Sequence, residues 1–385
     1  MQMPYTFQTV PQISVQAGAN AQLGQLLAQR FRPGRVMLVT DRFLVTSGLI
    51  APGLKSLQEA GWEVMVYDEV QADPPDHVVR AAAEKARAFG AQVVLGFGGG
   101  SSMDVAKLVA VLADSSQALE SMYGIDQVQG ARLPLIQIPT TAGTGSEVTP
   151  ISIVTTGETT KSGIVASQLY ADMVILDATL TTGLPPAVTA ATGIDAMVHA
   201  IEAYTSRHKK NPLSDHAATR ALALLSSNLL TAVKHGDDLR ARENMLLGSM
   251  LAGQAFANSP VAAVHALAYP LGGHFHIPHG LSNALVLGQV LRFNAEAAAP
   301  HYAELAEIVM PGASGSVEAR AAAFIARIES LVAQTALPMR LRDHKVPESM
   351  LERLAADAML QQRLLMNNPK DVTEADALAI YRAAY

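Results

Sequence analysis

Short β-branched runs alternate with helix-length segments over the first part of the chain, and this alternation limits the fold more than any other feature. The apolar runs lie at Arg35–Asp41, Glu63–Tyr67, Gln92–Gly96 and Leu133–Ile138. Between them stand segments such as Pro75–Phe89, whose apolar positions recur at helical spacing. Strand–helix–strand repeats of this kind predict an α/β domain, with a parallel sheet covered by helices on both faces. Ligands of such a domain bind beyond the carboxyl ends of the strands.

The strand signal fades after a Thr-Gly-Leu-Pro-Pro stretch at Thr182–Pro186, which predicts a domain boundary. The segments that follow are rich in Ala and Leu at helical spacing. They lie at Ala187–Tyr204, Ser214–Lys234, Leu239–Ala257, Ser282–Ala298, Ala319–Thr335 and Glu374–Ala384. We therefore expect an α/β domain over residues 1–181 and an all-helical domain over residues 182–385, with a ligand site in the cleft between them.

Composition excludes several classes of function. The net charge is 28 − 34 = −6 with no basic run, which argues against a nucleic-acid partner. The absence of Cys excludes disulfides, iron–sulfur clusters and thiolate-bound zinc, so any metal must be held by His and carboxylate groups. Neither a signal peptide nor a membrane-spanning run is recognisable. We expect a soluble, cytoplasmic protein without a membrane partner.

A glycine-rich turn follows the third apolar run. Gly98-Gly99-Gly100-Ser101-Ser102 leads directly into a helical segment, Val105–Leu112. Glycines allow an anion to approach the backbone closely, and the N–H groups that begin a helix attract phosphate. The turn is therefore a candidate for a dinucleotide pyrophosphate. A tight turn capped by Ser101, Ser102 and Asp104, without a ligand, explains the composition equally well.

Two further segments favour a dinucleotide. Asp41 ends the first apolar run, where a carboxylate accepts from a ribose 2′-OH and repels a 2′-phosphate, which favours NAD over NADP. The alternative is that Asp41 caps the helix beginning at Arg42. The loop Ile138–Glu147 is dense in hydroxyl groups and glycines, which suit phosphate or ribose but also satisfy a turn internally.

Histidine and carboxylate residues stand at metal-ligand spacing in the second half. Asp195 and His199 are four apart in a helical segment with small apolar neighbours, so we expect both on one helix face that points inward. A hydrogen-bonded pair without a metal is the alternative. Four of the 11 histidines then fall within 15 residues, His265 and His279 among them. His265 lies in an apolar helical stretch that we expect Pro270 to interrupt. Imidazole plus carboxylate without thiolate suits Fe²⁺ or Zn²⁺.

Taken together, these segments resemble the iron-containing (group III) alcohol dehydrogenase family over essentially the whole chain. Gly98–Lys107 is similar to that family's GGGSxxDxAK turn, and Pro139–Glu147 to its PTTxGTGSE loop. Ala191–Glu202 resembles its first metal segment, and His265 with His279, 14 residues apart, resembles its second. The resemblance implies a Rossmann-like N-terminal domain followed by a helical one, in a dehydroquinate synthase-like architecture. It also implies a homodimer.

The resemblance assigns roles residue by residue. It implies that Asp195, His199, His265 and His279 bind one divalent metal, Fe²⁺ or alternatively Zn²⁺. It implies that NAD is held by Asp41, Gly98, Gly99, Gly100, Ser101, Asp104, Thr140, Thr141, Thr144 and Lys161. The expected reaction is reversible hydride transfer between NAD(H) and a small alcohol, or its aldehyde or ketone, whose oxygen the metal binds.

One position departs from the family pattern. Many members have a second His four residues after the third ligand, where this chain has Tyr269. A phenol can relay a proton, but its pKa near 10 suits neutral pH less well than imidazole does. Tyr269 is therefore a candidate relay, and His274 and His276 are candidate substitutes. No side chain stands out as an obligatory base.

Three alternatives remain open from the sequence. A glycerol dehydrogenase-like zinc enzyme would share the ligand set. A dehydroquinate synthase-like lyase would use NAD transiently on a phosphorylated sugar acid, which calls for several basic groups, whereas the motif segments offer mainly Lys107 and Lys161. A non-catalytic nucleotide- or metal-binding module is the third alternative, and the intact ligand positions argue against it.

Overall fold

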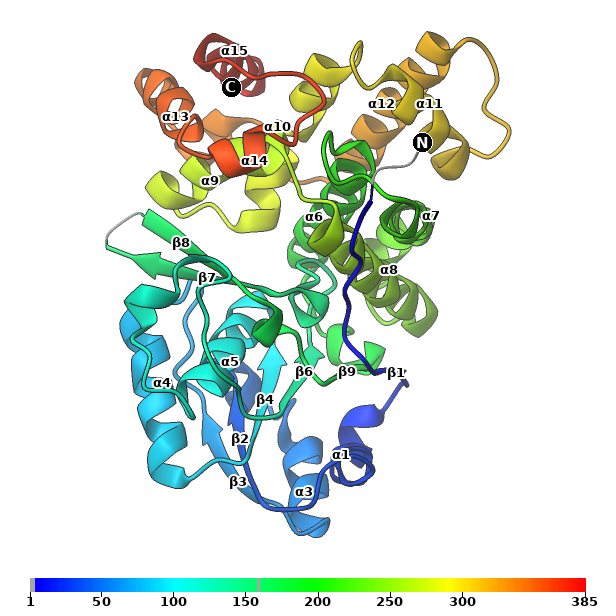
Figure 1. The fold of residues 1–385 in the computed structure, drawn as a ribbon. Coiled ribbons are helices and arrows are strands. Elements are labelled where there is room, and N and C mark those ends of the chain that lie inside the picture. The colour runs from blue at the N-terminus through cyan, green and yellow to red at the C-terminus, as the bar shows by residue number, and fades with distance from the viewer. Residues whose placement is uncertain (1–3, 158–159) are drawn as a thin grey trace. The chain divides into compact units, whose positions relative to one another are not determined.

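The computed structural model describes residues 4–157 and 160–385. The chain divides into two compact units, an α/β unit and a helical unit (Figure 1). The α/β unit comprises Thr9–Thr141 and Gly145–Gly183. The helical unit comprises Leu184–Tyr385, the short segment Ala142–Thr144 and the described residues up to Gln8. The boundary drawn between residues 181 and 182 from the sequence stays a prediction.

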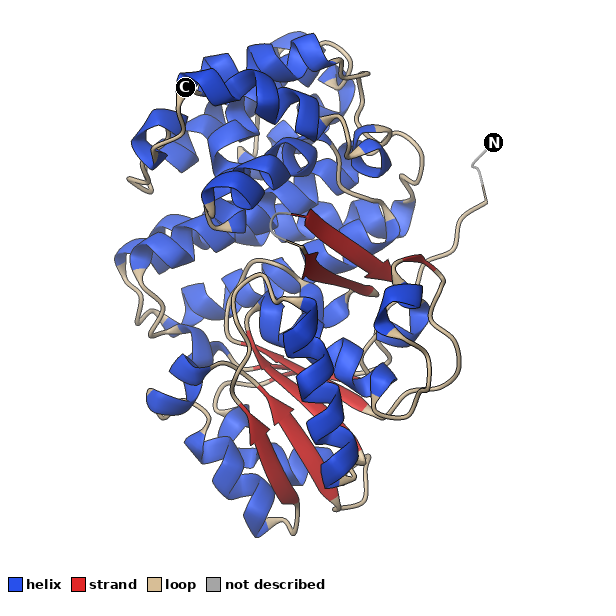
Figure 2. Ribbon diagram, turned by 90° about the vertical axis from the view of Figure 1, so that its left-hand side faces the viewer, coloured by secondary structure: helices blue, strands red, loops and turns tan. Residues whose placement is uncertain are grey.

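The α/β unit contains a parallel sheet of six strands in the order β1-β9-β6-β4-β2-β3. The strands are β1 (Ile13–Val15), β2 (Arg35–Val39), β3 (Glu63–Tyr67), β4 (Val93–Gly98), β6 (Leu135–Pro139) and β9 (Met173–Leu176). The helices of this unit are α1 (Leu23–Ala28), α2 (Arg42–Thr46), α3 (Ala51–Glu59), α4 (Asp76–Phe89) and α5 (Gly100–Leu112). The predicted parallel sheet and the helical second part are thus confirmed (Figure 2).

Alternating side chains of the strands build the core of this unit. Because successive residues of a strand point to opposite faces, β2 places Val36 and Leu38 on one face and β4 places Val93, Leu95 and Phe97 there. This face packs against buried residues of α1 and α3 and against Trp62. Helices α4 and α5 cover the opposite face. The strands are buried on both sides, which explains their nearly continuous apolar runs.

A second, three-stranded sheet in the α/β unit was not predicted. It has the order β5-β8-β7, with β5 (Gly124–Ile125), β7 (Ile151–Thr156) and β8 (Thr160–Val165). β7 and β8 pair antiparallel as a hairpin. The hydroxyl-rich loop leaves the main sheet at the end of β6, and the hairpin begins shortly after that loop, at Ile151.

The helical unit contains the helices expected from the sequence and three that were not predicted, at Ala299–Val309, Leu351–Ala358 and Gln362–Leu365. The helices of this unit are α6 (Pro186–Thr205), α7 (Pro212–Lys234), α8 (Leu239–Asn258), α9 (Ala263–Phe275), α10 (His279–Asn294), α11 (Ala299–Val309), α12 (Val317–Ala333), α13 (Leu351–Ala358), α14 (Gln362–Leu365) and α15 (Glu374–Ala384). The expected interruption at Pro270 is wrong, because α9 continues through Pro270 to Phe275. Within the described ranges, no helix has both the length and the apolarity to cross a bilayer.

Candidate functional site

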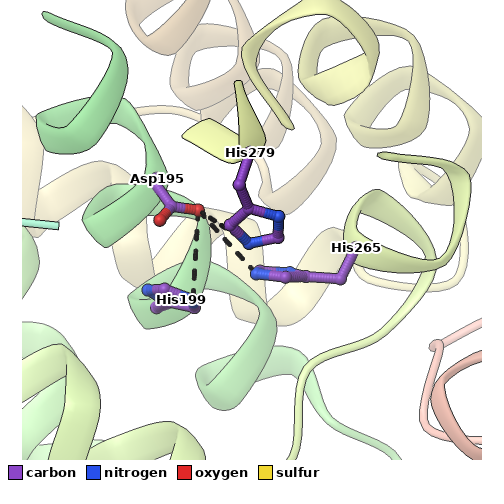
Figure 3. Close-up of side chains that lie close together, drawn as sticks. All are labelled: Asp195, His199, His265 and His279. Carbon is purple, nitrogen blue, oxygen red and sulfur yellow. Dashed lines mark ion pairs between the residues drawn. The ribbon is translucent and has the colours of Figure 1, made fainter. Parts of the chain in front are cut away.

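Asp195, His199, His265 and His279 converge in the helical unit from three helices. Asp195 and His199 are one turn apart on α6, His265 lies in the first turn of α9, and His279 begins α10 (Figure 3). The Nε2 atoms of His199 and His265 each lie 3.9 Å from Asp195 Oδ1, and that of His279 lies 3.7 Å away. One ligand atom from each residue lies within 4.8 Å of all the others.

Glycine at position 280 makes this convergence possible. A Cβ atom there would lie 2.5 Å from the carbonyl oxygen of Ala191 and 3.3 Å from Asp195 Cβ. Only glycine therefore lets the start of α10 approach α6 closely enough to bring His279 to Asp195. The geometry of the four candidate ligands therefore depends on Gly280.

The donor set fits a divalent transition metal. The carboxylate oxygen and the Nε2 atoms stand too far apart to hydrogen-bond directly, yet all face one point. Three imidazole nitrogens and one carboxylate oxygen, without thiolate, suit Fe²⁺ or Zn²⁺. The side chains of Asp195, His199 and His265 are almost fully buried, whereas that of His279 is 34% exposed. Of the four side chains, that of His279 is therefore the one most exposed to solvent.

The surroundings of His199 and Asp195 favour the protonation states that metal binding needs, and for His199 the cause is burial. It lowers the pKa of His199 to about 3, so the imidazole is neutral at pH 7 and keeps a lone pair for a ligand bond. Burial alone raises the pKa of Asp195, but the three histidines and a hydrogen bond from Asn283 outweigh it. The pKa of Asp195 thus lies below its ordinary value and the carboxylate is charged.

Asn283 and Glu202 contact this set, and neither was identified from the sequence. Asn283 Nδ2 donates to Asp195 Oδ1 at 2.6 Å, and Glu202 accepts from the Nδ1 side of His265 at 2.7 Å. Both are buried. A signal was present, since Glu202 lies three residues after His199 and Asn283 four after His279, on the same helix faces as the ligands.

Tyr269, the candidate relay, lies on α9, and its ring centre is 6.1 Å from that of His279. The candidate substitutes differ from it. His274 Nε2 lies 2.7 Å from Asp357 Oδ2, so this imidazole is tied to α13. His276 closes α9 with a left-handed backbone, at φ 53°. Of the three, Tyr269 is the one placed beside a member of the ligand set.

The glycine-rich turn in the α/β unit has the form that a pyrophosphate needs. Gly98 has φ 152°, and a Cβ there would lie 2.6 Å from Ser102 Oγ, so this position requires glycine. Gly99 is the N-cap of α5, and Gly100 and Ser101 form its first turn. A Cβ on Gly99 would meet only the Thr141 side chain, at 3.7 Å. Thr140 donates its N–H to the carbonyl of Gly98, so the hydroxyl-rich loop runs beside the turn.

The other predicted cofactor residues have protein partners of their own. Asp41 Oδ1 accepts from the backbone N–H of Leu44, which is the capping alternative weighed above. Lys161 Nζ lies 2.6 Å from Asp73 Oδ1. Thr144 belongs to the segment grouped with the helical unit. The cofactor roles of these three residues, like those of the glycine turn, Thr140 and Thr141, stay predictions.

Asp104 points away from the glycine turn into a buried polar network. Its Oδ1 accepts from Ser146 Oγ at 2.6 Å and its Oδ2 from the N–H of Ile153 at 2.9 Å. Fully buried Lys107 donates to Ser146 Oγ and to the carbonyl of Ile151, and lies 3.4 Å from Asp104. The network therefore joins α5 to the hydroxyl-rich loop and to β7.

Comparison with known proteins decides the family. A family model described as iron-containing alcohol dehydrogenase matches residues 11–178. The model of the C-terminal part of the Fe-containing alcohol dehydrogenase family matches residues 189–385. The chain belongs to the iron-containing alcohol dehydrogenase family. It is therefore an oxidoreductase, and the resemblance found in its motifs is confirmed.

Individual members of the family resemble the chain over nearly its whole length. Long-chain-alcohol dehydrogenase 1 of Geobacillus thermodenitrificans is 43% identical over 94% of this chain and 93% of its own. A crystal structure of 1,3-propanediol oxidoreductase superposes with a TM-score of 0.95 at 35% identity and covers 100% of both chains. The crystal structure of sulfoacetaldehyde reductase from Bifidobacterium kashiwanohense in complex with NAD⁺ superposes with a TM-score of 0.88 at 28% identity and covers 100% of this chain and 99% of its own. The lyase and glycerol dehydrogenase alternatives gain no support from these comparisons.

Loss of the buried cation of the polar network should destabilise the α/β unit. We expect Lys107→Met to lower the free energy of unfolding by about 3 kcal/mol, because it leaves Asp104 without its buried partner. The single Trp62 lies in the core of this unit, so its fluorescence during urea unfolding reports the change. Lys85→Met is the control, since Lys85 pairs with Glu69 at a half-exposed position and should cost less than about 1 kcal/mol. Equal losses in both variants would contradict the role of the network.

Glu147 makes the stability of the α/β unit depend on pH. Burial raises the pKa of Glu147 from 4.5 to about 7. Between these pH values the Glu147 carboxyl is ionised in the unfolded chain and still protonated in the native state. The native state therefore loses stability as the pH rises through this window, by about 3 kcal/mol at most. We expect the free energy of unfolding of Glu147→Gln, relative to that of the wild type, to rise by that amount between pH 4.5 and 7.5, as measured by Trp62 fluorescence. The control is Glu84→Gln, on the exposed side of α4, whose free energy of unfolding should depend on pH as that of the wild type does. If the free energy of unfolding of Glu147→Gln has the same pH dependence as that of the wild type, the prediction is refuted.

Proposed function

We propose that the protein is an NAD- and Fe²⁺-dependent dehydrogenase, which oxidises a small alcohol to its aldehyde or ketone and catalyses the reverse reduction. The observation that carries this proposal is the convergence of Asp195 Oδ1 with three imidazole Nε2 atoms in a buried set that opens beside His279. We assign these four residues as the metal ligands. We assign the glycine turn at Gly98, Gly99, Gly100 and Ser101 as the pyrophosphate site.

The protein's own groups hold and orient the reactants. A divalent ion held by the four residues would polarise a substrate oxygen as a Lewis acid, and NAD(H) would carry the hydride. Asp195 would supply one negative charge and the three imidazoles would supply lone pairs, so a divalent ion held there would keep net positive charge toward a substrate oxygen. The start of α5 offers N–H groups without intrahelical partners to the pyrophosphate. Tyr269, beside His279, is the proposed proton relay.

The proposed substrate class rests on the named relatives. Two of them are named for long-chain alcohols and 1,3-propanediol. The test is a panel of alcohols from ethanol and 1,3-propanediol to long-chain alcohols, with NAD⁺ or NADP⁺, on protein reconstituted with Fe²⁺ or Zn²⁺. We expect net NADH formation with at least one alcohol in the Fe²⁺-loaded protein. No turnover with any alcohol would overturn the proposal, and preference for NADP⁺ would remove the role of Asp41.

The homodimer and the cytoplasmic location stay predictions. Light scattering on the purified protein checks the first, with about twice the 40.6 kDa chain mass as the expected result. Cell fractionation checks the second.

A further inference from the structure

Glu202 is a buried carboxylate whose acceptor positions are filled by groups around His265. It lies on α6, is 4% exposed, and is not itself one of the four ligands. Its Oε2 lies 2.7 Å from His265 Nδ1 and accepts the N–H of Ala262 at 2.9 Å, while its Oε1 accepts the N–H of Val264 at 2.7 Å. The carboxylate therefore holds both the ring of His265 and the backbone that begins α9.

These contacts determine which nitrogen of His265 carries the proton. An ionised carboxylate only accepts hydrogen bonds, so the contact to Glu202 requires a proton on Nδ1. In a neutral imidazole, Nε2 then carries no proton and acts as an acceptor. This is the nitrogen that faces Asp195 Oδ1 at 3.9 Å.

Asn283 supports the same tautomer independently. Its amide nitrogen is the group 2.6 Å from Asp195 Oδ1, because a carboxylate accepts a hydrogen bond from the amide nitrogen rather than from its oxygen. The same nitrogen lies 3.3 Å from His265 Nε2. A donor at that position matches an Nε2 atom that accepts.

We propose that Glu202 is a positioning residue for the metal site, which fixes the proton of His265 on Nδ1 and turns its unprotonated Nε2 toward the other three ligands. The inference rests on the proposed metal-dependent function. Groups that bond the second nitrogen of a ligating histidine fix its tautomer and orientation, and their loss weakens metal affinity about 10- to 100-fold. Glu202 does this while its carboxylate also caps α9, where Ala262 provides no side-chain cap.

The experiment measures metal affinity rather than turnover. Glu202→Gln replaces a group that accepts at both oxygens by one that accepts at a single oxygen. We expect its Zn²⁺ dissociation constant, measured by competition with a chelator on the folded metal-free protein, to rise about 10- to 100-fold. The visible spectrum of bound Co²⁺ should also change, which a loss of helix capping alone would not cause. The control is Glu304→Gln. Glu304 lies on α11 and accepts a hydrogen bond from Tyr204, which is on α6 like Glu202, and none of the hydrogen bonds described for Glu304 reaches the four ligands.

The outcomes separate this inference from the proposed function. A wild-type protein that binds neither Zn²⁺ nor Co²⁺ would overturn both. A wild type that binds, together with a Glu202→Gln variant of equal affinity and spectrum, would overturn only the role of Glu202. If the variant does not fold, nitrogen NMR of the ¹⁵N-histidine-labelled, metal-free wild type decides. A proton on Nδ1 of His265 is expected, and a proton on Nε2 overturns the inference.

Discussion

Asp195→Asn is expected to abolish stoichiometric metal binding and to lower kcat/KM at least 1000-fold, on the order of 4 kcal/mol of transition-state stabilisation. Asp195 Oδ1 faces the Nε2 atoms of all three histidines, and among the four predicted ligands only Asp195 carries a negative charge. The amide has nearly the same size but no charge, so it cannot balance a divalent ion. Metal content per chain and NAD-linked alcohol oxidation measure the two effects.

The control for this variant is Asp371→Asn, which removes a carboxylate that is 91% exposed and pairs with Arg207. It should keep both metal and turnover. Treatment of the wild type with a chelator should reproduce the loss of turnover, and added Fe²⁺ should restore it. If Asp195→Asn retains full metal content and turnover, the assignment of the ligand set is wrong.

Gly99→Ala is expected to raise KM for NAD⁺ roughly 10- to 100-fold, or about 1.4 to 2.7 kcal/mol, while the fold stays intact. A Cβ on Gly99 meets no atom of the protein closer than 3.7 Å, and its backbone at φ −78° suits alanine. The methyl group would nevertheless stand where a pyrophosphate must approach the start of α5. Steady-state kinetics at varied NAD⁺ and urea unfolding followed by Trp62 fluorescence give the two measurements.

Gly98→Ala, one residue earlier, makes a matched comparison. At φ 152° and with Ser102 Oγ 2.6 Å from the new Cβ, this variant should lose stability as well as cofactor affinity. A normal KM for NAD⁺ in a well-folded Gly99→Ala protein would remove the pyrophosphate from this turn.

Much of the α/β unit was predictable because its signals are local. Glu63–Tyr67 is the strand β3 to the residue, and Pro75–Phe89 differs from α4 only at its first residue. The helix after the glycine turn was expected from Val105, but it begins at Gly100, because the N–H groups at its start belong to the turn itself. The β7–β8 hairpin was missed although its pairing is local, with Thr156 opposite Thr160.

Pro270 shows the limit of a local rule. A proline inside a helix removes one hydrogen bond and crowds the preceding turn, which predicted an interruption. The residues around it are buried and α9 packs against α10 and α13, so tertiary packing outweighs the local cost.

The sequence alone predicted which residue types could hold a metal and which motif could hold the cofactor, because ligand chemistry and short-range spacing are properties of the residues themselves. Only the tertiary structure decided that α6, α9 and α10 cross with His279 beside Asp195, that Asp104 turns toward Ser146, and that Glu202 reaches His265. Contacts of that kind join residues up to 84 positions apart in the chain. They depend on how buried helix faces pack, and no local pattern specifies which faces meet.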